Sequence, residues 1–177
     1  MKRYHPVLVT LHWLLAAMIA GALVMGGQVL ARTPNADPAK LLGLKMHMAI
    51  GIIILVLMLL RLAIHFKTKK PPQADIGNAV LNTGGSIAHY MLYALVIAMS
   101  LSGLAIANAA GLPAIVFGGS GEALPADFND IAPRAAHGLL ALVLKLVILG
   151  HVLAALYHQF VRKDSLLSRM WYGDRGA

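Results

Sequence analysis

Histidine is the residue type in this chain with the clearest chemical meaning. The 177 residues include eight histidines and no cysteine, so thiolate metal sites and disulfide scaffolds are excluded. His137 and His151 are fourteen residues apart, which on an α-helix is about 40° short of four full turns and keeps both side chains on one face. Their separation along the helix axis is roughly 21 Å, whereas a metal ion binds nitrogen at only about 2 Å. The spacing therefore predicts two separate centres, one above the other.

Composition indicates the kind of element that carries these histidines. The chain is 59% hydrophobic and 12% charged, with a mean hydropathy of +0.73, whereas an ordinary soluble domain is about a quarter charged. Four apolar stretches reach the length of about 20 residues that a spanning helix needs, and they cover residues 7–30, 41–64, 87–108 and 135–161. Polar connections with proline or glycine separate them, including a predicted break at Gly84 and Gly85. We expect an all-α fold, a four-helix transmembrane bundle that forms a single domain over residues 1–177.

The distribution of basic residues predicts how this bundle lies in the membrane. Four spans place both ends of the chain on one side, and that side holds ten of the fifteen Lys and Arg residues: Lys2, Arg3, Arg61, Lys67, Lys69, Lys70, Arg162, Lys163, Arg169 and Arg175. The opposite side holds four, namely Arg32, Lys40, Lys45 and Arg134, and Lys145 lies inside a span. The positive-inside rule then places both termini in the cytoplasm, and this topology explains the net charge of +8 without a nucleic-acid partner. A cleaved signal peptide is the alternative interpretation of the first apolar stretch, which is longer than a signal core and carries His12.

Each predicted centre needs a second ligand at the same depth in the membrane. The second span enters from the outer side, so His47, a few residues into it, pairs by depth with His137 near the outer end of the fourth span. The first span enters from the cytoplasmic side, so His12 pairs with His151. Two facing imidazoles without a carboxylate suit a haem b with histidine as both axial ligands, whereas a zinc site needs three or four ligands at one level. A lone histidine would be interpreted as a cross-helix hydrogen bond, but four paired by depth favour the ligation of two haem b groups.

Further polar residues lie near the cytoplasmic-side centre. Arg61 is fourteen residues after His47 and shares its face, so it is a candidate partner for a haem propionate. His89 and His158 lie on the same side of the membrane, and the sequence leaves open whether they replace a ligand of that haem, hydrogen-bond its propionates or line a quinone pocket. Lys145 lies between the two haem levels, about 80° from the histidine face, and no role is predicted for it.

In this order and spacing, these residues resemble the bacterial cytochrome b561 family. The resemblance extends from about Val7 to Met170 and rests on Leu11-His12-Trp13, on Met46-His47 followed by Gly51 and Arg61, on His89, on His137 and His151, and on the tail residues His158, Lys163, Asp164 and Leu167. It implies a four-helix dihaem b cytochrome of the bacterial inner membrane that exchanges electrons with ubiquinone. It also implies that His12 and His151 hold one haem and that His47 and His137 hold the other.

The resemblance implies two kinds of function. At least one family member is a superoxide oxidase, and we expect this chain to be a superoxide:ubiquinone oxidoreductase in which Lys40, Lys45 and Arg134 steer the anion toward the outer haem. The alternative is an electron-transfer subunit without activity of its own, which links a periplasmic dehydrogenase or hydrogenase to the quinone pool. A metal or proton transporter is less favoured, because the spans hold no carboxylate and show no two-fold repeat. No catalytic side chain is predicted, since the haems would carry the one-electron chemistry.

Overall fold

The computed structural model describes residues 3–72 and 75–173, and within these ranges all regular structure is helical. Among these described residues, four helices are long and apolar enough to cross a membrane: Pro6–Leu30, Pro38–Lys67, Ala79–Ala109 and Ala132–Arg162. The predicted all-α fold with four spans is therefore confirmed. Lys2 and Arg175, which were counted among the basic residues near the termini, lie outside the described residues.

The helix ends follow from local sequence signals. Helices α1 (Pro6–Val24), α2 (Pro38–Lys67) and α5 (Ala132–Leu156) each have a proline within their first two residues, where the missing N–H leaves no hydrogen bond unmade. Asp37 caps α2 by accepting a hydrogen bond from the Ala39 amide, as N-cap residues do. The first and last spans end in π-helical turns, η1 (Met25–Leu30) and η2 (Tyr157–Arg162).

The structure corrects the sequence prediction for the third span and its flanking connection. Helix α3 (Ala79–Ala109) begins well before residue 87 and passes through Gly84 and Gly85, so the predicted break there is wrong. A glycine inside a helix costs only about 1 kcal/mol relative to alanine, and the Asn78 side chain caps the start by accepting from the Leu81 amide. After α3, Gly111 adopts a left-handed conformation with φ of 64° and leads into a short helix, α4 (Leu112–Val116), that was not predicted.

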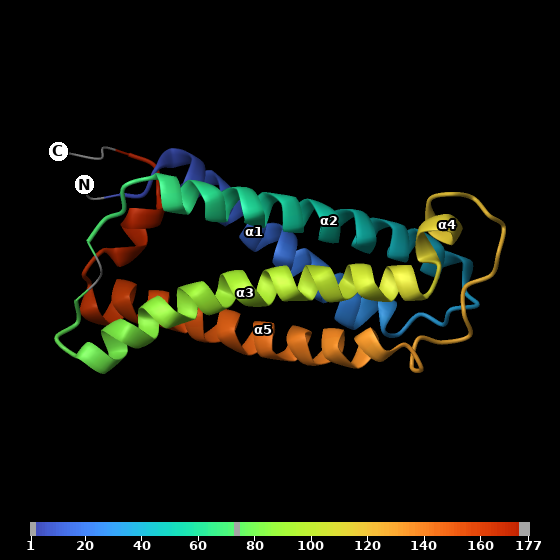
Figure 1. Cartoon of the computed structure of the whole chain (residues 1–177). Coiled ribbons are helices and arrows are strands. Elements are labelled where there is room, and N and C mark those ends of the chain that lie inside the picture. The colour runs from blue at the N-terminus through green and yellow to red at the C-terminus, as the bar shows by residue number, and fades with distance from the viewer. Residues whose placement is uncertain (1–2, 73–74, 174–177) are drawn as a thin grey trace.

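The helices form a bundle in which α1 packs against α2, α2 against α3, and α3 against α5 (Figure 1). We call the end that carries α4 and its neighbouring connections the loop end. The opposite, terminal end brings both ends of the chain together, where the Arg3 guanidinium donates to the Tyr172 carbonyl oxygen at 2.7 Å. A short 3₁₀ segment, η3 (Leu166–Met170), lies there too, and the Trp13 indole donates to the Met170 carbonyl oxygen at 2.8 Å.

The buried side chains form two layers across the bundle. A middle layer consists of Leu15, Ile54, Met58, Tyr93, Val96 and Leu144. A second layer beneath the loop end consists of Leu30, Leu44, Ala107, Leu112, Ile115 and Val116. Many other large apolar side chains are exposed on the outside of the bundle, which suits a chain whose surroundings are lipid.

Candidate functional site

Four histidines from three helices form two facing pairs. His47 of α2 and His137 of α5 make the loop-end pair, with ring centres 6.4 Å apart and ring planes at 76°. His12 of α1 and His151 of α5 make the terminal-end pair, with ring centres 6.2 Å apart and planes at 68°. The structure thus brings together the same partners that the depth argument paired.

These distances fit one metal centre between each pair of rings. An imidazole nitrogen lies about 1.1 Å from its ring centre and binds a metal at about 2 Å, so two axial imidazoles place their ring centres about 6.2 Å apart. Within residues 3–72 and 75–173, no group of three or more His, Cys, Asp or Glu side chains is placed to hold a metal ion. A two-histidine donor set suits haem iron, whose remaining ligands come from the porphyrin, and does not suit zinc.

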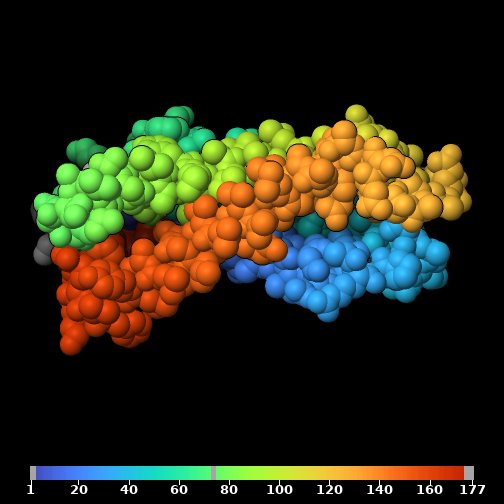
Figure 2. Space-filling model, turned by 90° about the horizontal axis from the view of Figure 1, so that it is seen from below, coloured from blue at the N-terminus to red at the C-terminus, as the bar shows by residue number. Residues whose placement is uncertain are grey.

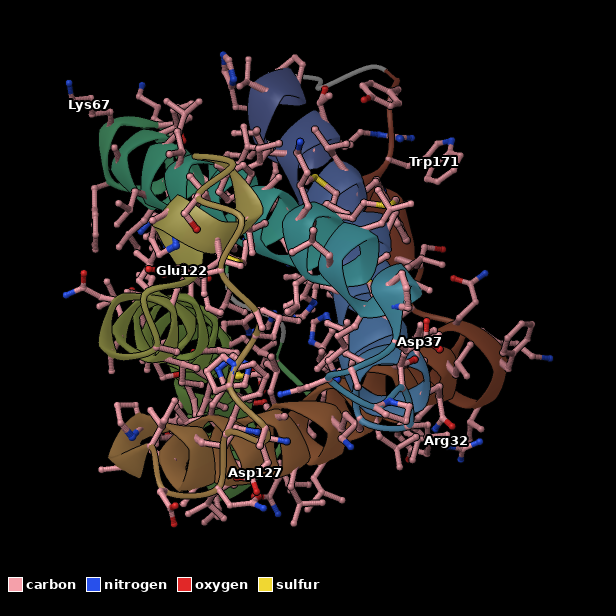
Figure 3. The ribbon with its side chains drawn as sticks, turned by 90° about the vertical axis from the view of Figure 1, so that its right-hand side faces the viewer. Arg32, Asp37, Lys67, Glu122, Asp127 and Trp171 are labelled. Atoms are coloured by element: carbon pink, nitrogen blue, oxygen red, sulfur yellow. The ribbon has the colours of Figure 1, made fainter. Side chains whose placement is uncertain are left out.

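A cavity of about 560 Å³ adjoins the loop-end pair, and both rings line it. Residues of α1, η1, α2, α3 and α5 surround this cavity, and the connections at the loop end close over it. Figure 2 shows the surface hollowed between the orange atoms of α5 and the blue atoms of the first span. In Figure 3, seen along the bundle from the loop end, Asp37 and Asp127 mark the connections that lead into α2 and α5.

Glycines give the loop-end rings their space. A Cβ atom on Gly26 would lie 3.2 Å from Cε1 of His47, and one on Gly103 would lie 3.4 Å from Cε1 of His137. Gly51 also lines the cavity, and a Cβ there would meet no atom within 4 Å. Gly26 and Gly103 were not predicted as site residues, although the Gly26-Gly27 pair inside an apolar run was a visible signal.

A serine orients the His137 ring. The Ser102 hydroxyl donates its single hydrogen to the Met99 carbonyl oxygen at 2.8 Å, so its oxygen accepts from Nδ1 of His137 at 2.9 Å. Because Nδ1 then carries the proton, Nε2 keeps the lone pair that a metal needs. Nδ1 of His47 is buried without a hydrogen-bond partner in the described part of the chain. Buried nitrogens in native structures nearly always have a partner, so this orphaned atom is consistent with a bound group beside the ring.

Arg61 lies beside the terminal-end pair. Its Nη1 donates to the Tyr93 hydroxyl at 2.7 Å, and its Nη2 lies 3.4 Å from Nδ1 of His12. Its Nε is buried and has no hydrogen-bond partner among the residues described. The guanidinium therefore sits where the spacing predicted, with donor capacity left over for an anionic group. Tyr93, which fixes it, was not singled out in the sequence.

The two further histidines take different positions. The His89 ring centre lies 5.2 Å from that of His151, and its Nδ1 donates to the Gly85 carbonyl oxygen at 2.6 Å. This ring separation is shorter than the value of about 6.2 Å expected for two axial ligands of one metal, so the geometry favours His12 as the partner of His151. His158 instead pairs with Asp164, with 2.5 Å between Nδ1 and Oδ2.

Asp164 links the end of the last span to the residues that follow it. Desolvation tends to raise the pKa of its carboxyl, but hydrogen bonds from His158, the Leu166 amide and Arg162 outweigh it and leave the pKa below its usual value. A carboxylate that is stabilised in this way remains ionised and keeps the His158 ring in its contact.

The three cations predicted to steer an anion differ in their surroundings. Lys40 is only 6% exposed and donates from Nζ to the carbonyl oxygens of Leu30 at 2.5 Å and Thr33 at 2.7 Å. Arg134 lines the loop-end cavity beside Gly138. Lys45 is exposed, with Nζ 6.0 Å from the centre of the Phe117 ring. Lys145 also lines the cavity.

Comparison with known proteins assigns the chain to a family. The family described as prokaryotic cytochrome b561 matches residues 3–173. The chain is 31% identical over 179 residues to a Yersinia pestis protein named probable superoxide oxidase CybB, with 99% of each chain covered. It is 29% identical to cytochrome b562 of Cereibacter sphaeroides, covering 94% of each chain. It is 26% identical to cytochrome b561 homolog 2 of Escherichia coli, covering 96% of this chain and 91% of the relative.

Proposed function

Because the chain belongs to the prokaryotic cytochrome b561 family of membrane electron-transfer proteins, we propose that it is a dihaem b cytochrome that takes electrons from superoxide and passes them to ubiquinone. The observation that carries this proposal is the spacing of the two histidine pairs, 6.4 Å and 6.2 Å between ring centres. Full-length similarity to a protein named as a probable superoxide oxidase supports the choice of donor.

Under this proposal, the helices bind and orient two haem b groups. His47 and His137 would hold the haem at the loop end, and His12 and His151 would hold the haem at the terminal end. Bound haem supplies one-electron redox chemistry. Ser102 holds the His137 ring with Nε2 unprotonated, and the middle apolar layer keeps water from the space between the two pairs. Arg61 is placed to pair with a propionate, and His89 and His158 are candidates for binding a propionate or the quinone.

The proposed orientation places the loop end in the periplasm and both termini in the cytoplasm of a bacterial inner membrane. It rests on the excess of Lys and Arg at the terminal end, as the positive-inside rule requires. Superoxide, a small anion, would then meet Lys40, Lys45 and Arg134 at the end that it reaches from outside. A field from these cations raises the rate of encounter with an anion.

Purified protein given superoxide and a ubiquinone analogue tests the function. We expect quinone reduction that depends on the amount of haem-loaded protein. A subunit that serves only a periplasmic dehydrogenase or hydrogenase would carry haem and yet fail to reduce quinone from superoxide. Haem-loaded protein without this activity would therefore contradict the proposed donor and favour the subunit.

Removing the loop-end cations is expected to change the salt dependence of this reaction. Replacing Lys40, Lys45 and Arg134 together by glutamine should lower the rate with superoxide at low ionic strength by roughly tenfold, and should flatten its decrease with added salt. The measurement is stopped-flow haem reduction, normalised to bound haem. Lys67→Gln, which removes a cation from the terminal end of α2, should leave the salt profile unchanged. An unaltered profile in the triple variant would refute steering.

Ser102→Ala is expected to weaken haem binding at the loop end. Losing the hydrogen bond to Nδ1 of His137 frees the ring to rotate, and loss of such a supporting contact costs roughly 10–100-fold in metal affinity. Titration of haem into haem-free protein measures the effect. Ser102→Thr, which keeps the hydroxyl, should bind as the wild type does, and equal affinity in all three proteins would contradict this role of Ser102.

A further inference from the structure

Two cations occupy matching positions at the loop end of the cavity. Lys40 is the third residue of α2 and Arg134 is the third residue of α5, and both line the cavity that holds the His47 and His137 rings. Neither helix has an acidic residue in its first turn. A cation in the first turn is unfavourable, because the helix dipole already makes this end positive. The Asp37 carboxylate at the N-cap of α2 accepts from the Ala39 amide and lies outside the lining of this cavity. Lys40 and Arg134 therefore place two positive charges at one end of one cavity.

This positive charge lacks an anionic partner within the described ranges. The ion pairs found there join Asp164 to His158 and Arg162 only. Asp127 lines the same cavity, but its carboxylate accepts a hydrogen bond from the Asn129 amide at 2.8 Å and forms no ion pair with Lys40 or Arg134. Lys40 is 6% exposed and uses two of its three hydrogens on backbone carbonyls. A buried charge without a counter-charge is costly, so the arrangement fits a bound anion.

The lining of the cavity indicates how such an anion is attached. The end near Lys40 and Arg134 carries the polar side chains of Thr33, Asn35 and Asn129. The part that adjoins the middle layer is mostly apolar and includes Ile54, Val96 and Leu144, with Lys145 next to Leu144 in the lining. A flat molecule with one apolar edge and one acidic edge would lie with its acidic edge toward the two cations.

We propose that Lys40 and Arg134 bind the two propionate carboxylates of the haem held by His47 and His137. This inference rests on the proposed function, because it requires a haem at the loop-end pair. Two cations balance two carboxylates, and Lys45 remains on the surface with its Nζ 6.0 Å from the centre of the Phe117 ring. The competing explanation is structural: Lys40 only caps the carbonyls at the end of η1. The Arg134 side chain donates to no backbone carbonyl in the described chain. The effect of replacing Arg134 therefore distinguishes propionate binding from a purely structural role.

The test compares two porphyrins that differ only in these carboxylates. Haem-free protein in detergent is titrated with haem b or with haem b dimethyl ester, whose acid groups are esterified and uncharged. The same titration is carried out on His137→Ala. Binding at the loop end is the absorbance change that the wild type shows and this variant does not. We expect the wild type to bind haem b at least about tenfold more tightly than the ester there.

Charge-removing variants should abolish this preference. Lys40→Met and Arg134→Gln should each reduce it, and together they should make the two porphyrins bind equally. Arg32→Gln removes an exposed cation from the same end that does not line the cavity, so it should keep the full preference. If Lys40→Met fails to fold, Arg134→Gln alone gives the same comparison.

Three results would overturn the inference. The first is equal binding of both porphyrins by the wild type. The second is a combined variant that keeps the full preference for haem b. The third is a loss of affinity, in each variant, by the same factor for both porphyrins. The last result would show that the two side chains only support the fold. A wild-type protein that bound neither porphyrin would instead contradict the proposed function, so the two failures are distinguishable.

Discussion

Replacing His137 by alanine is expected to remove one of two b-type haems and to leave the other in place. The variant loses one of the two rings that face each other across 6.4 Å at the loop end, and iron with a single protein ligand is held poorly. The terminal-end pair lies beyond the middle apolar layer and keeps its ring spacing of 6.2 Å. The haem-to-protein ratio should fall from about two to about one, as measured by pyridine haemochrome and protein assay.

The reciprocal variants provide the control. His47→Ala should lose the same haem as His137→Ala, whereas His12→Ala and His151→Ala should lose the other one, which the reduced-minus-oxidised spectra of the remaining haems distinguish. His89→Ala should retain both haems, because its ring lies too close to His151 to share an iron with it. A folded His137→Ala protein without any haem would contradict two independently held centres.

Filling the glycine beside His47 should also empty the loop-end site. A Cβ on Gly26 would already lie 3.2 Å from Cε1 of His47, and the further atoms of leucine must displace the ring or occupy the cavity that both line. We therefore expect Gly26→Leu to lose the loop-end haem while the first span still inserts. The measurement is the haem-to-protein ratio together with the spectrum of the haem that remains.

Gly21→Leu is the matched control for this experiment. Gly21 lies in the same span, is exposed, and would place its Cβ more than 4 Å from any other side chain. It should keep both haems, because a leucine there faces lipid. If Gly26→Leu bound haem as Gly21→Leu does, the ring of His47 would not need the space that Gly26 leaves.

The positions of the spans and the pairing of the histidines follow from simple rules in the sequence. Span number needs only apolar length, and helical periodicity with the direction of each span gives the depth and face of a side chain. On that basis His47 pairs with His137 and His12 with His151, and the structure places the two rings of each pair opposite each other, with their planes steeply inclined.

Features that depend on packing between helices could not be predicted. Ser102 and Tyr93 look like ordinary polar or aromatic residues of a span until α3 is placed beside α5 and α2, where they contact His137 and Arg61. Lys40 looked like a surface cation, yet its side chain turns inward to the carbonyl oxygens of Leu30, at the end of the first span, and of Thr33, just after it. The start of α3 was misplaced because a cap at Asn78 offsets the weak helix propensity of two glycines.

The most direct test of the account is the reduced-minus-oxidised visible spectrum of the purified wild-type protein, taken with its haem-to-protein ratio. We expect the spectrum of low-spin b-type haem with histidine as both axial ligands, at about two haems per chain. A folded, detergent-extracted protein without colour or bound iron would contradict the assignment of both histidine pairs, and with it the proposed electron transfer.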